Sequence, residues 1–175
     1  MTASIVLLTG ADLEAQLPGL AETLRACVHE GGNLGFLLPC PLAETEAFFR
    51  DQVFPEVRAG KRLLWAAVQD GEAVGTVQMI TAMPPSQPHR ADIVKLVVHP
   101  KARRQGLANR LMAALEEGAR QRGKTLLTLD TLSDSPAQPF YEGLGFQVTG
   151  KVPGFCLDVS GEELVPTTFM YKHLV

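Results

Sequence analysis

The sequence predicts a single mixed α/β domain over residues 1–175, built on one sheet with both antiparallel and parallel strands. Two apolar runs, 63–69 and 73–79, flank Asp70-Gly71, a dipeptide that supplies the positive φ values of a tight β-hairpin. Farther along, strand, helix and strand patterns succeed one another at 89–98, 106–122 and 126–131. Such a crossover is right-handed and pairs its two strands in parallel. With 46% apolar and 20% charged residues, the chain has enough apolar side chains for one sizeable core.

The N-terminal part of the chain predicts a strand, a helix and a loop. Residues 4–8 form an apolar run of strand length. Asp12 is placed to cap a helix over 12–29, which we expect to be interrupted or restarted near Pro18 because proline lacks the N–H of a helical hydrogen bond. Segment 29–36 is too rich in glycine for regular structure and predicts a loop.

A second helix and a second loop precede the central strand. The helix is expected over 42–59, where apolar residues recur at three- and four-residue steps. The proline-rich segment 83–88 cannot continue a central strand, so it predicts a loop that leads into strand 89–98. Gly123 is expected to end the helix of the crossover.

The segment between strand 89–98 and the following helix carries the clearest functional signal. Gly106 lets the backbone approach a ligand closely, and Ala108 leaves room one step later. The first N–H groups of a helix are unpaired and carry a partial positive charge, so they can cradle a phosphate. Segment 101–110 contains four cations and no acid, although the whole chain has a net charge of −3. This local excess of positive charge predicts a polyanionic ligand.

The C-terminal part predicts a short helix and two final strands. Pro136 suits a first helical turn and Gly145 a helix end, so a short helix is followed by a strand from Phe146. The final strands are expected at 147–152 and 167–172, with an exposed loop over 153–162 between them.

Composition limits the classes of function. A net charge of −3 argues against general binding to nucleic acid or to an anionic membrane, because both favour a wide basic surface. No apolar run approaches the roughly 18–20 residues needed to span a bilayer, and the first residues do not resemble a signal peptide, so we expect a cytoplasmic protein. Three cysteines without a Cys-x-x-Cys pair predict reduced thiols, and four scattered histidines predict no metal site.

Two motifs resemble a known family. Arg103-x-x-Gly106-x-Ala108 after a strand resembles the phosphate-binding signature of the GCN5-related N-acetyltransferases (GNAT), whose turn binds the pyrophosphate of acetyl-CoA. Phe140-Tyr141-x-x-x-Gly145-Phe146 is similar to a second GNAT motif, in which the tyrosine lies near the acetyl-CoA sulfur. The resemblance implies a twisted, mostly antiparallel sheet of about six or seven strands, flanked by about four helices, with one parallel strand pair that splays apart.

The resemblance also implies acetyl-CoA as the acetyl donor, without a metal, and a set of residues that bind it. The pantetheine arm is expected to lie along the strand backbone of 96–98 where the parallel strands separate, and a backbone N–H near Val98 to polarise the thioester carbonyl. The expected cofactor-binding residues are Leu96, Val97, Val98, Arg103, Arg104, Gln105, Gly106, Leu107, Ala108, Asn109, Ser135 and Phe140.

Three side chains are candidates for the chemistry. An amine attacks a thioester only as the neutral base, so a proton must leave it, and the departing thiolate benefits from a proton donor. Tyr141 is the expected acid, whereas Asp130 and Asp92 are alternatives for holding the ammonium and accepting its proton. Either aspartate could instead be a hydrogen-bonded structural residue. The resemblance to one GNAT group, the bacterial tabtoxin-resistance acetyltransferases, places site positions on all three, with Asp92 where that group carries Glu.

That group, whose acceptor is a small amino-acid-like toxin, is similar to this chain over nearly its whole length. The segments that carry the similarity are 63–65, 90–96, 129–131, 140–141, 153–156, 166–167 and 171–172. The leading hypothesis is therefore direct transfer, in a ternary complex, of an acetyl group to the primary amine of a small amino-acid-like or antibiotic-like acceptor. The resemblance implies that helices 12–29 and 42–59 flank the acceptor and that the final strands allow a homodimer. From its exposed polar residues, we also expect loop 153–162 to close the acceptor site.

Two other functions stay open. One is acetylation of a protein N-terminus or lysine, which requires an open groove of peptide size. The other is a non-catalytic regulatory module that binds CoA. An intact phosphate turn does not separate these from the leading hypothesis, but the presence of Asp130 and Tyr141 favours an enzyme.

Overall fold

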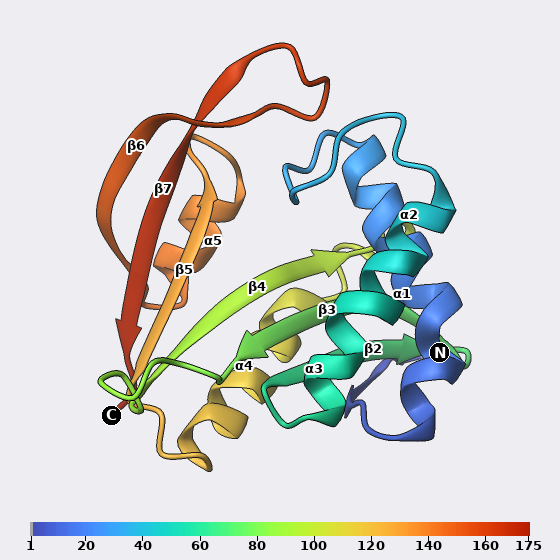
Figure 1. Ribbon diagram of the computed structural model, residues 1–175, viewed down its shortest axis with the longest axis horizontal. Helices are drawn as coiled ribbons and strands as arrows, with labels where there is room; N and C mark the ends of the chain where they lie inside the picture. The colour runs from blue at the N-terminus through green and yellow to red at the C-terminus, as the bar shows by residue number, and fades with distance from the viewer. Residues whose placement is uncertain (1) are drawn as a thin grey trace.

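One sheet of seven strands runs through the protein, with helices on both of its faces (Figure 1). The computed structural model describes residues 2–175. Across the sheet the strands are β1 (Ser4–Leu7), β2 (Arg62–Gln69), β3 (Glu72–Ile80), β4 (Arg90–Val98), β5 (Leu126–Leu132), β7 (Leu164–His173) and β6 (Gln147–Leu157). Every neighbouring pair is antiparallel except β4 and β5, which are parallel. The predicted mixed, mostly antiparallel sheet is confirmed.

The helices divide between the two faces according to the alternation of the strands. One face carries α1 (Ala11–His29), α2 (Leu42–Ala47), the π-helical turn η1 (Phe48–Val53) and α3 (Phe54–Arg58). The 3₁₀ turn η2 (Pro100–Ala102), α4 (Leu107–Arg120) and α5 (Ala137–Gly143) belong to the other. In β2, Leu64 and Ala66 pack in the cluster on the α1 side, whereas Trp65 and Ala67 pack in the cluster on the α4 side. Alternate residues of one strand thus supply two cores.

Helix α1 differs from the prediction at Pro18 and at its N-terminus. It continues through Pro18 without a break, because its buried leucines lose more by exposure than the proline costs in a missing hydrogen bond. Its N-cap is Gly10, without a side-chain cap, while Asp12 lies within the first turn. The expected break and the expected aspartate cap are both wrong.

The predicted helix over 42–59 is present as a continuous helical run over 42–58, but its middle turn is a π-helix. This turn ends just before Pro55, which has no N–H to donate. The wider winding places Phe49 and Phe54, five residues apart, in the same buried cluster. The local hydrogen-bond pattern follows the packing of the phenylalanines.

The hairpin between β2 and β3 is confirmed at its turn, because both Asp70 and Gly71 have positive φ. A β-bulge interrupts the next pair, β3 and β4. The ladder passes from Thr76 opposite Val97 to Gln78 opposite Val94, and Lys95 in the bulge has a φ of 56°. This bulge redirects the second half of β4.

The parallel pair is short. Strands β4 and β5 are in register only where Arg90–Asp92 lies beside Leu126–Thr128, and we call these three residue pairs the β4–β5 joint. Beyond the joint the two strands diverge (Figure 1), as the resemblance implied. The crossover through α4 begins at Gly106 and ends in a turn in which Gly123 has positive φ, as predicted.

The predicted loop over 153–162 is wrong. Strand β6 continues to Leu157 and β7 begins at Leu164, so only the turn 158–163 is irregular. The ladder between these strands shifts register between Val152 and Cys156, and Gly154 has positive φ there. Pro153 is tolerated in the strand because it falls in this interruption of the ladder. No helix within residues 2–175 is both long and apolar enough to cross a membrane.

Candidate active site

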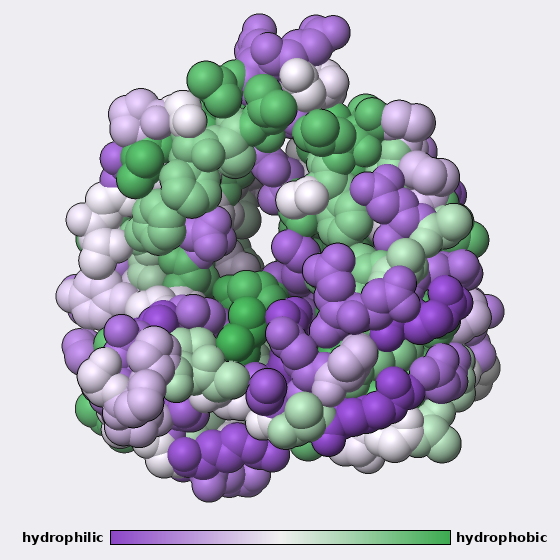
Figure 2. Space-filling model, viewed as in Figure 1, coloured by the Kyte–Doolittle hydropathy of each residue, from purple (hydrophilic) through white to green (hydrophobic). Residues whose placement is uncertain are grey.

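A cavity of about 880 Å³ lies where β4 and β5 separate. In the space-filling view it appears as an opening through the molecule, between the part that carries β5, β6 and β7 and the part that carries α1 and β2–β4 (Figure 2). Its walls come from α1, the loop after it, β4, β5, α5 and β6. Among the lining residues are Cys27, Glu30, Asn33, Leu34, Lys95, Leu96, Val97, Val98, Arg103, Ala108, Asp130, Thr131, Leu132, Ser135, Phe140, Tyr141, Phe155 and Cys156.

The start of α4 has the features expected of an anion site. Gly106 is the N-cap, with a φ of 70° and no side-chain cap, and a Cβ built on it meets no atom within 4 Å. The first hydrogen bond of the helix runs from the N–H of Arg110 to the carbonyl of Gly106 at 3.1 Å. No acceptor within residues 2–175 pairs with the N–H groups of 107–109. Donors without an acceptor beside an exposed turn suit a phosphate.

Of the residues expected to bind the cofactor, most meet at the cavity or at its edge. Leu96, Val97, Val98, Arg103, Ala108, Ser135 and Phe140 line it. Residues 104–106 are exposed in the turn that leads into α4. The side chain of Leu107 is buried in the core, so only its backbone can contact a ligand.

Arg103 links the phosphate turn to α1. Its Nε donates to the carbonyl oxygen of Val98 at 3.3 Å, and its Nη1 forms a 2.6 Å ion pair with Glu30. The same carbonyl accepts from Sγ of Cys27 at 3.4 Å. Both carboxylate and guanidinium are about half exposed, so this pair can open to release the guanidinium toward an anion.

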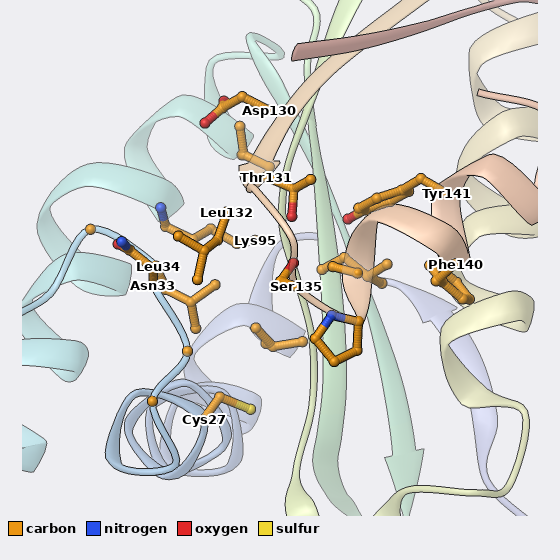
Figure 3. A pocket seen from close by; sticks show the side chains of 18 of the residues that line it. Cys27, Asn33, Leu34, Lys95, Asp130, Thr131, Leu132, Ser135, Phe140 and Tyr141 are labelled. Atoms are coloured by element: carbon orange, nitrogen blue, oxygen red, sulfur yellow. The ribbon is translucent and has the colours of Figure 1, made fainter. Parts of the chain in front are cut away.

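Tyr141 reaches the cavity from α5. Its ring packs edge-on against Phe140 and Phe146, with ring centroids 5.4 and 5.7 Å away. Its hydroxyl points into the cavity (Figure 3) and pairs with no side chain or backbone group in the described part of the chain. Burial, followed by the negative charge of Asp130, raises the pKa of Tyr141 well above its usual value. The phenol therefore stays protonated near neutral pH and can donate.

Asp130 enters the cavity from β5. Figure 3 shows its carboxylate directed toward the side where Asn33, Leu34 and Lys95 lie. No side chain among residues 2–175 forms an ion pair with it. Burial raises the pKa of Asp130 above its usual value, and the positive charge of Lys95 opposes that rise. Asp130 is nonetheless exposed in the opening between the two strands, and a carboxylate there without a fixed partner is available to a cationic ligand and to its proton.

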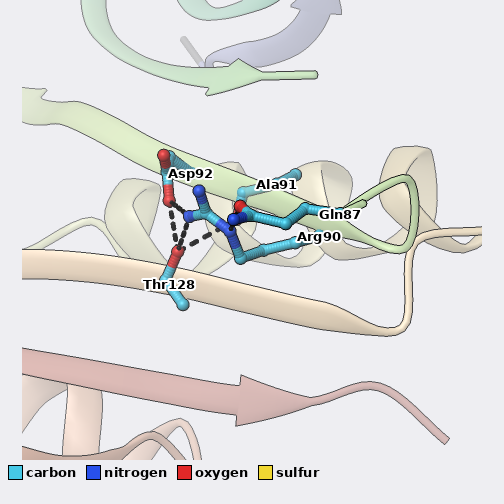
Figure 4. A network of polar contacts seen from close by, with 5 residues as sticks. All are labelled: Gln87, Arg90, Ala91, Asp92 and Thr128. Carbon is cyan, nitrogen blue, oxygen red and sulfur yellow. Dashed lines mark hydrogen bonds and ion pairs between the residues drawn. The ribbon is translucent and has the colours of Figure 1, made fainter. Parts of the chain in front are cut away.

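Asp92 lies outside this group. It does not line the cavity, and its carboxylate accepts hydrogen bonds from Arg90 and from the hydroxyl of Thr128 across the β4–β5 joint (Figure 4). Arg90 also donates to Thr128 at 2.7 Å and to Gln87 at 2.9 Å. The structure thus brings Tyr141 and Asp130 to one cavity and leaves Asp92 in a polar network that joins two strands.

One buried polar atom in the cavity wall has no hydrogen-bond partner in the described part of the chain. Oγ of Ser135 is buried and forms no hydrogen bond within residues 2–175. Because a buried hydroxyl without a partner is costly, its place in the wall indicates a polar ligand group. Ser135 was among the residues expected to bind the cofactor, and this orphaned donor fits the amides and hydroxyl of a pantetheine arm.

Sequence reasoning missed much of the wall opposite the phosphate turn. Asn33 donates to the carbonyl of Leu157 at 3.1 Å, and the N–H of Leu38 donates to Val159 at 2.8 Å. These bonds fasten the loop after α1 to the β6–β7 hairpin, and Phe155 and Cys156 of segment 153–162 line the cavity. Lys95 was visible as a polar residue in an apolar strand, but nothing in the sequence marked the bulge that carries it.

Comparison with known proteins identifies relatives. The family description "Acetyltransferase (GNAT) family" matches residues 35–146. An uncharacterized N-acetyltransferase from the hisH–hisA intergenic region of Azospirillum brasilense is 32% identical over 126 residues, which are 70% of this chain and 72% of that protein. N-acetyltransferase 8 of Rattus norvegicus is 35% identical over 89 residues, which are 50% of this chain and 40% of that protein.

Solved structures share the fold at low sequence identity. An N-acetyltransferase from Staphylococcus aureus Mu50 superimposes with a TM-score of 0.78 at 16% identity, covering 100% of both chains. A ribosomal-protein-alanine N-acetyltransferase from Brucella melitensis gives 0.76 at 22% identity, covering 98% of this chain and 99% of that one. The putative acetyltransferase yncA of Salmonella typhimurium, solved with acetyl-CoA, gives 0.73 at 18% identity, covering 100% and 95%.

Proposed function

The chain belongs to the GNAT family of acetyltransferases, and from this premise we propose that it transfers the acetyl group of acetyl-CoA to the primary amine of a small molecule. The observation that carries the proposal is that the phosphate turn, Tyr141 and Asp130 all adjoin one cavity between β4 and β5. Each part corresponds to one need of the reaction: holding the donor, protonating the leaving thiolate and accepting the amine proton.

The donor fits the side of the cavity that faces α4 and α5. The free N–H groups at the start of α4 would bind its pyrophosphate, and the separated edge of β4 would pair with its pantetheine amides. The buried hydroxyl of Ser135 supplies a further polar contact. The neighbour solved with acetyl-CoA supports this choice of donor.

The acceptor fits the side that faces α1 and the loop after it. We propose that Asp130 holds its ammonium and takes up the proton, directly or through a water, so that the nitrogen lone pair can attack the thioester carbonyl. As the C–N bond forms and the C–S bond breaks, the electron pair passes to sulfur. Tyr141 then donates its proton to that sulfur and yields free CoA, and the second proton that the nitrogen loses as the amide forms restores the phenol, directly or through a water. No acetylated side chain is needed, because both substrates occupy the cavity together.

The covering of the cavity favours a small acceptor. The β6–β7 hairpin is fastened to the loop after α1 by the Asn33–Leu157 and Leu38–Val159 hydrogen bonds, so the two parts of the molecule are bridged at one end of the acceptor side. A peptide substrate needs an open groove instead. The resemblance to the tabtoxin-resistance group that we proposed from segments such as 90–96 would fit an amino-acid-like or toxin-like acceptor, whereas the Brucella neighbour represents the protein-acetylating alternative.

The test is release of CoA thiol from acetyl-CoA in the presence of four acceptor classes: amino acids, polyamines, aminoglycosides and peptides. We expect thiol release with at least one small amine and only background release with peptides that carry a free N-terminus or lysine. Turnover confined to peptides would establish the protein-acetylating alternative. Tight binding of acetyl-CoA without turnover on any class would establish a regulatory module.

The Asp130→Asn substitution tests the proposed base. It preserves size and removes the negative charge, so we expect the KM of the amine to rise and kcat to fall by about 10²-fold or more, with little change in acetyl-CoA affinity. The acidic limb of the kcat/KM profile against pH should disappear, because that limb reports protonation of the base.

Asp92→Asn is the matched control for this substitution. It removes the same charge from a residue that pairs with Arg90 and Thr128, so we expect a lower melting temperature with the acidic limb intact. Loss of the acidic limb in Asp92→Asn, with the limb retained in Asp130→Asn, would move the role of base to β4.

A further inference from the structure

One lysine in the candidate active site lacks an anionic partner. Lys95 lines both the 880 Å³ cavity and an adjoining cavity of about 490 Å³. Its ammonium lies 5.7 Å from the ring centre of Phe48, and a Cβ built on Gly35 would be 3.7 Å from its Nζ. Nothing in the described chain forms a hydrogen bond or an ion pair with that nitrogen. An ammonium in this position has lost water without gaining an acceptor.

The bulge in β4 is what directs Lys95 into the cavity. Its φ of 56° is a left-handed conformation that L-residues rarely adopt, and such strain clusters at ligand-binding positions. Ile93 packs in the core cluster on the α4 side, whereas Val97 packs in the cluster on the α1 side. In a regular strand these residues and Lys95 would share one face. The bulge breaks that alternation and frees Lys95 from both cores.

Lys95 and Asp130 form a separated pair of charges. Both lie just past the β4–β5 joint, Lys95 on one diverging strand and Asp130 on the other. Figure 3 shows the two side chains directed toward the same side of the cavity, yet they form no ion pair. Burial lowers the pKa of Lys95, and the negative charge of Asp130 opposes this. One wall region therefore presents a cation and an anion to the same ligand.

We infer that Lys95 binds an anionic group of the acceptor, so that the acceptor is a zwitterion such as an amino acid, with its carboxylate on Lys95 and its ammonium on Asp130. This inference rests on the proposed acetyltransferase function. A carboxylate would give Nζ the charge-assisted hydrogen bond that the protein does not supply. The side chain of the acceptor would extend past Lys95 into the smaller cavity, whose wall includes Phe36 and Phe48 together with the acidic residues Glu44 and Asp51. Polyamines and aminoglycosides, which carry no anion, would leave Lys95 unpaired.

The test compares acceptors that differ only in the anionic group: an amino acid, its carboxamide and its decarboxylated amine. For the wild-type protein we expect kcat/KM for the acid to exceed that for the carboxamide by about 10- to 100-fold, the usual worth of a charged hydrogen bond. Lys95→Met should abolish this difference by raising the KM of the acid while sparing the two acceptors that lack the carboxylate. Lys95→Arg should retain part of it, and Lys61→Met, at an exposed site, should leave it unchanged.

The outcomes separate this inference from the function on which it rests. Two results would overturn the role of Lys95 while leaving an active acetyltransferase. One is equally fast thiol release by the wild-type protein with the acid and the carboxamide. The other is an equal decrease in thiol release for both acceptors in Lys95→Met. If kcat/KM in Lys95→Met fell equally for all three acceptors, Lys95 would act only through the charge of Asp130. Absence of thiol release from the wild-type protein with every amine would overturn the proposed function itself, and the inference with it.

Discussion

Replacing Tyr141 by phenylalanine is expected to lower kcat by about 10²- to 10⁴-fold, the range for loss of a general acid. The substitution keeps the ring and its edge contacts with Phe140 and Phe146, so the melting temperature and the affinity for acetyl-CoA should change little. What is lost is a hydroxyl that points into the cavity and remains protonated near neutral pH. Steady-state kinetics together with calorimetric titration of acetyl-CoA would measure both effects.

Tyr171→Phe is the matched control for Tyr141→Phe. It removes the same atom from a tyrosine on β7, whose hydroxyl donates to Gln147 at 2.8 Å outside the cavity. Its kcat should equal that of the wild-type protein. If Tyr141→Phe retained full kcat, Tyr141 would be a packing residue of α5 and the leaving thiolate would take its proton from water.

Gly106→Asp is expected to weaken acetyl-CoA binding by about 100-fold or more, because like charges held together cost several kcal/mol. The added carboxylate would stand among the free N–H groups of α4, where we propose that the pyrophosphate binds. The fold should tolerate it: a Cβ meets no atom within 4 Å, and aspartate is a favourable N-cap that tolerates a left-handed conformation. Isothermal titration calorimetry and thermal unfolding would measure affinity and stability separately.

Gly106→Asn separates charge from shape in this experiment. Asparagine has the same size as aspartate and tolerates the same φ of 70°, but it does not repel a phosphate. We expect it to bind acetyl-CoA at least tenfold more tightly than Gly106→Asp. Unchanged affinity in a folded Gly106→Asp variant would place the phosphates elsewhere.

The elements that sequence predicted well are those that local chemistry determines. The turn at Asp70-Gly71 needs positive φ at both positions, and the strand, helix and strand from β4 to β5 follow from apolar periodicity. The phosphate turn is local for the same reason, since Gly106 and the start of α4 are neighbours in sequence. Tyr141 could be proposed because two motifs occur in the order that GNAT proteins share, and Asp130 because the reaction requires an acceptor for the amine proton.

The elements that sequence missed depend on contacts between distant segments. Pro18 does not break α1, because buried leucines on both sides of it hold the helix against the sheet. Pro153 does not end β6, because the register shift against β7 removes the need for its N–H. The bulge at Lys95 depends on the partner strand β3, so its orientation toward the cavity could not be predicted from β4 alone.

The width of the cavity depends on the angle between β4 and β5 at the β4–β5 joint. Only three residue pairs hold the two halves of the sheet together there, and the contacts of Arg90, Asp92 and Thr128 bind the pivot. Val98 lies six residues past Asp92, about 20 Å from the pivot at roughly 3.3 Å per residue, so a rotation of about 3° moves it by about 1 Å. A displacement of that size can cost an enzyme about a hundredfold in rate. Through its contacts at the β4–β5 joint, Asp92 thus affects the alignment of donor and acceptor although it does not line the cavity.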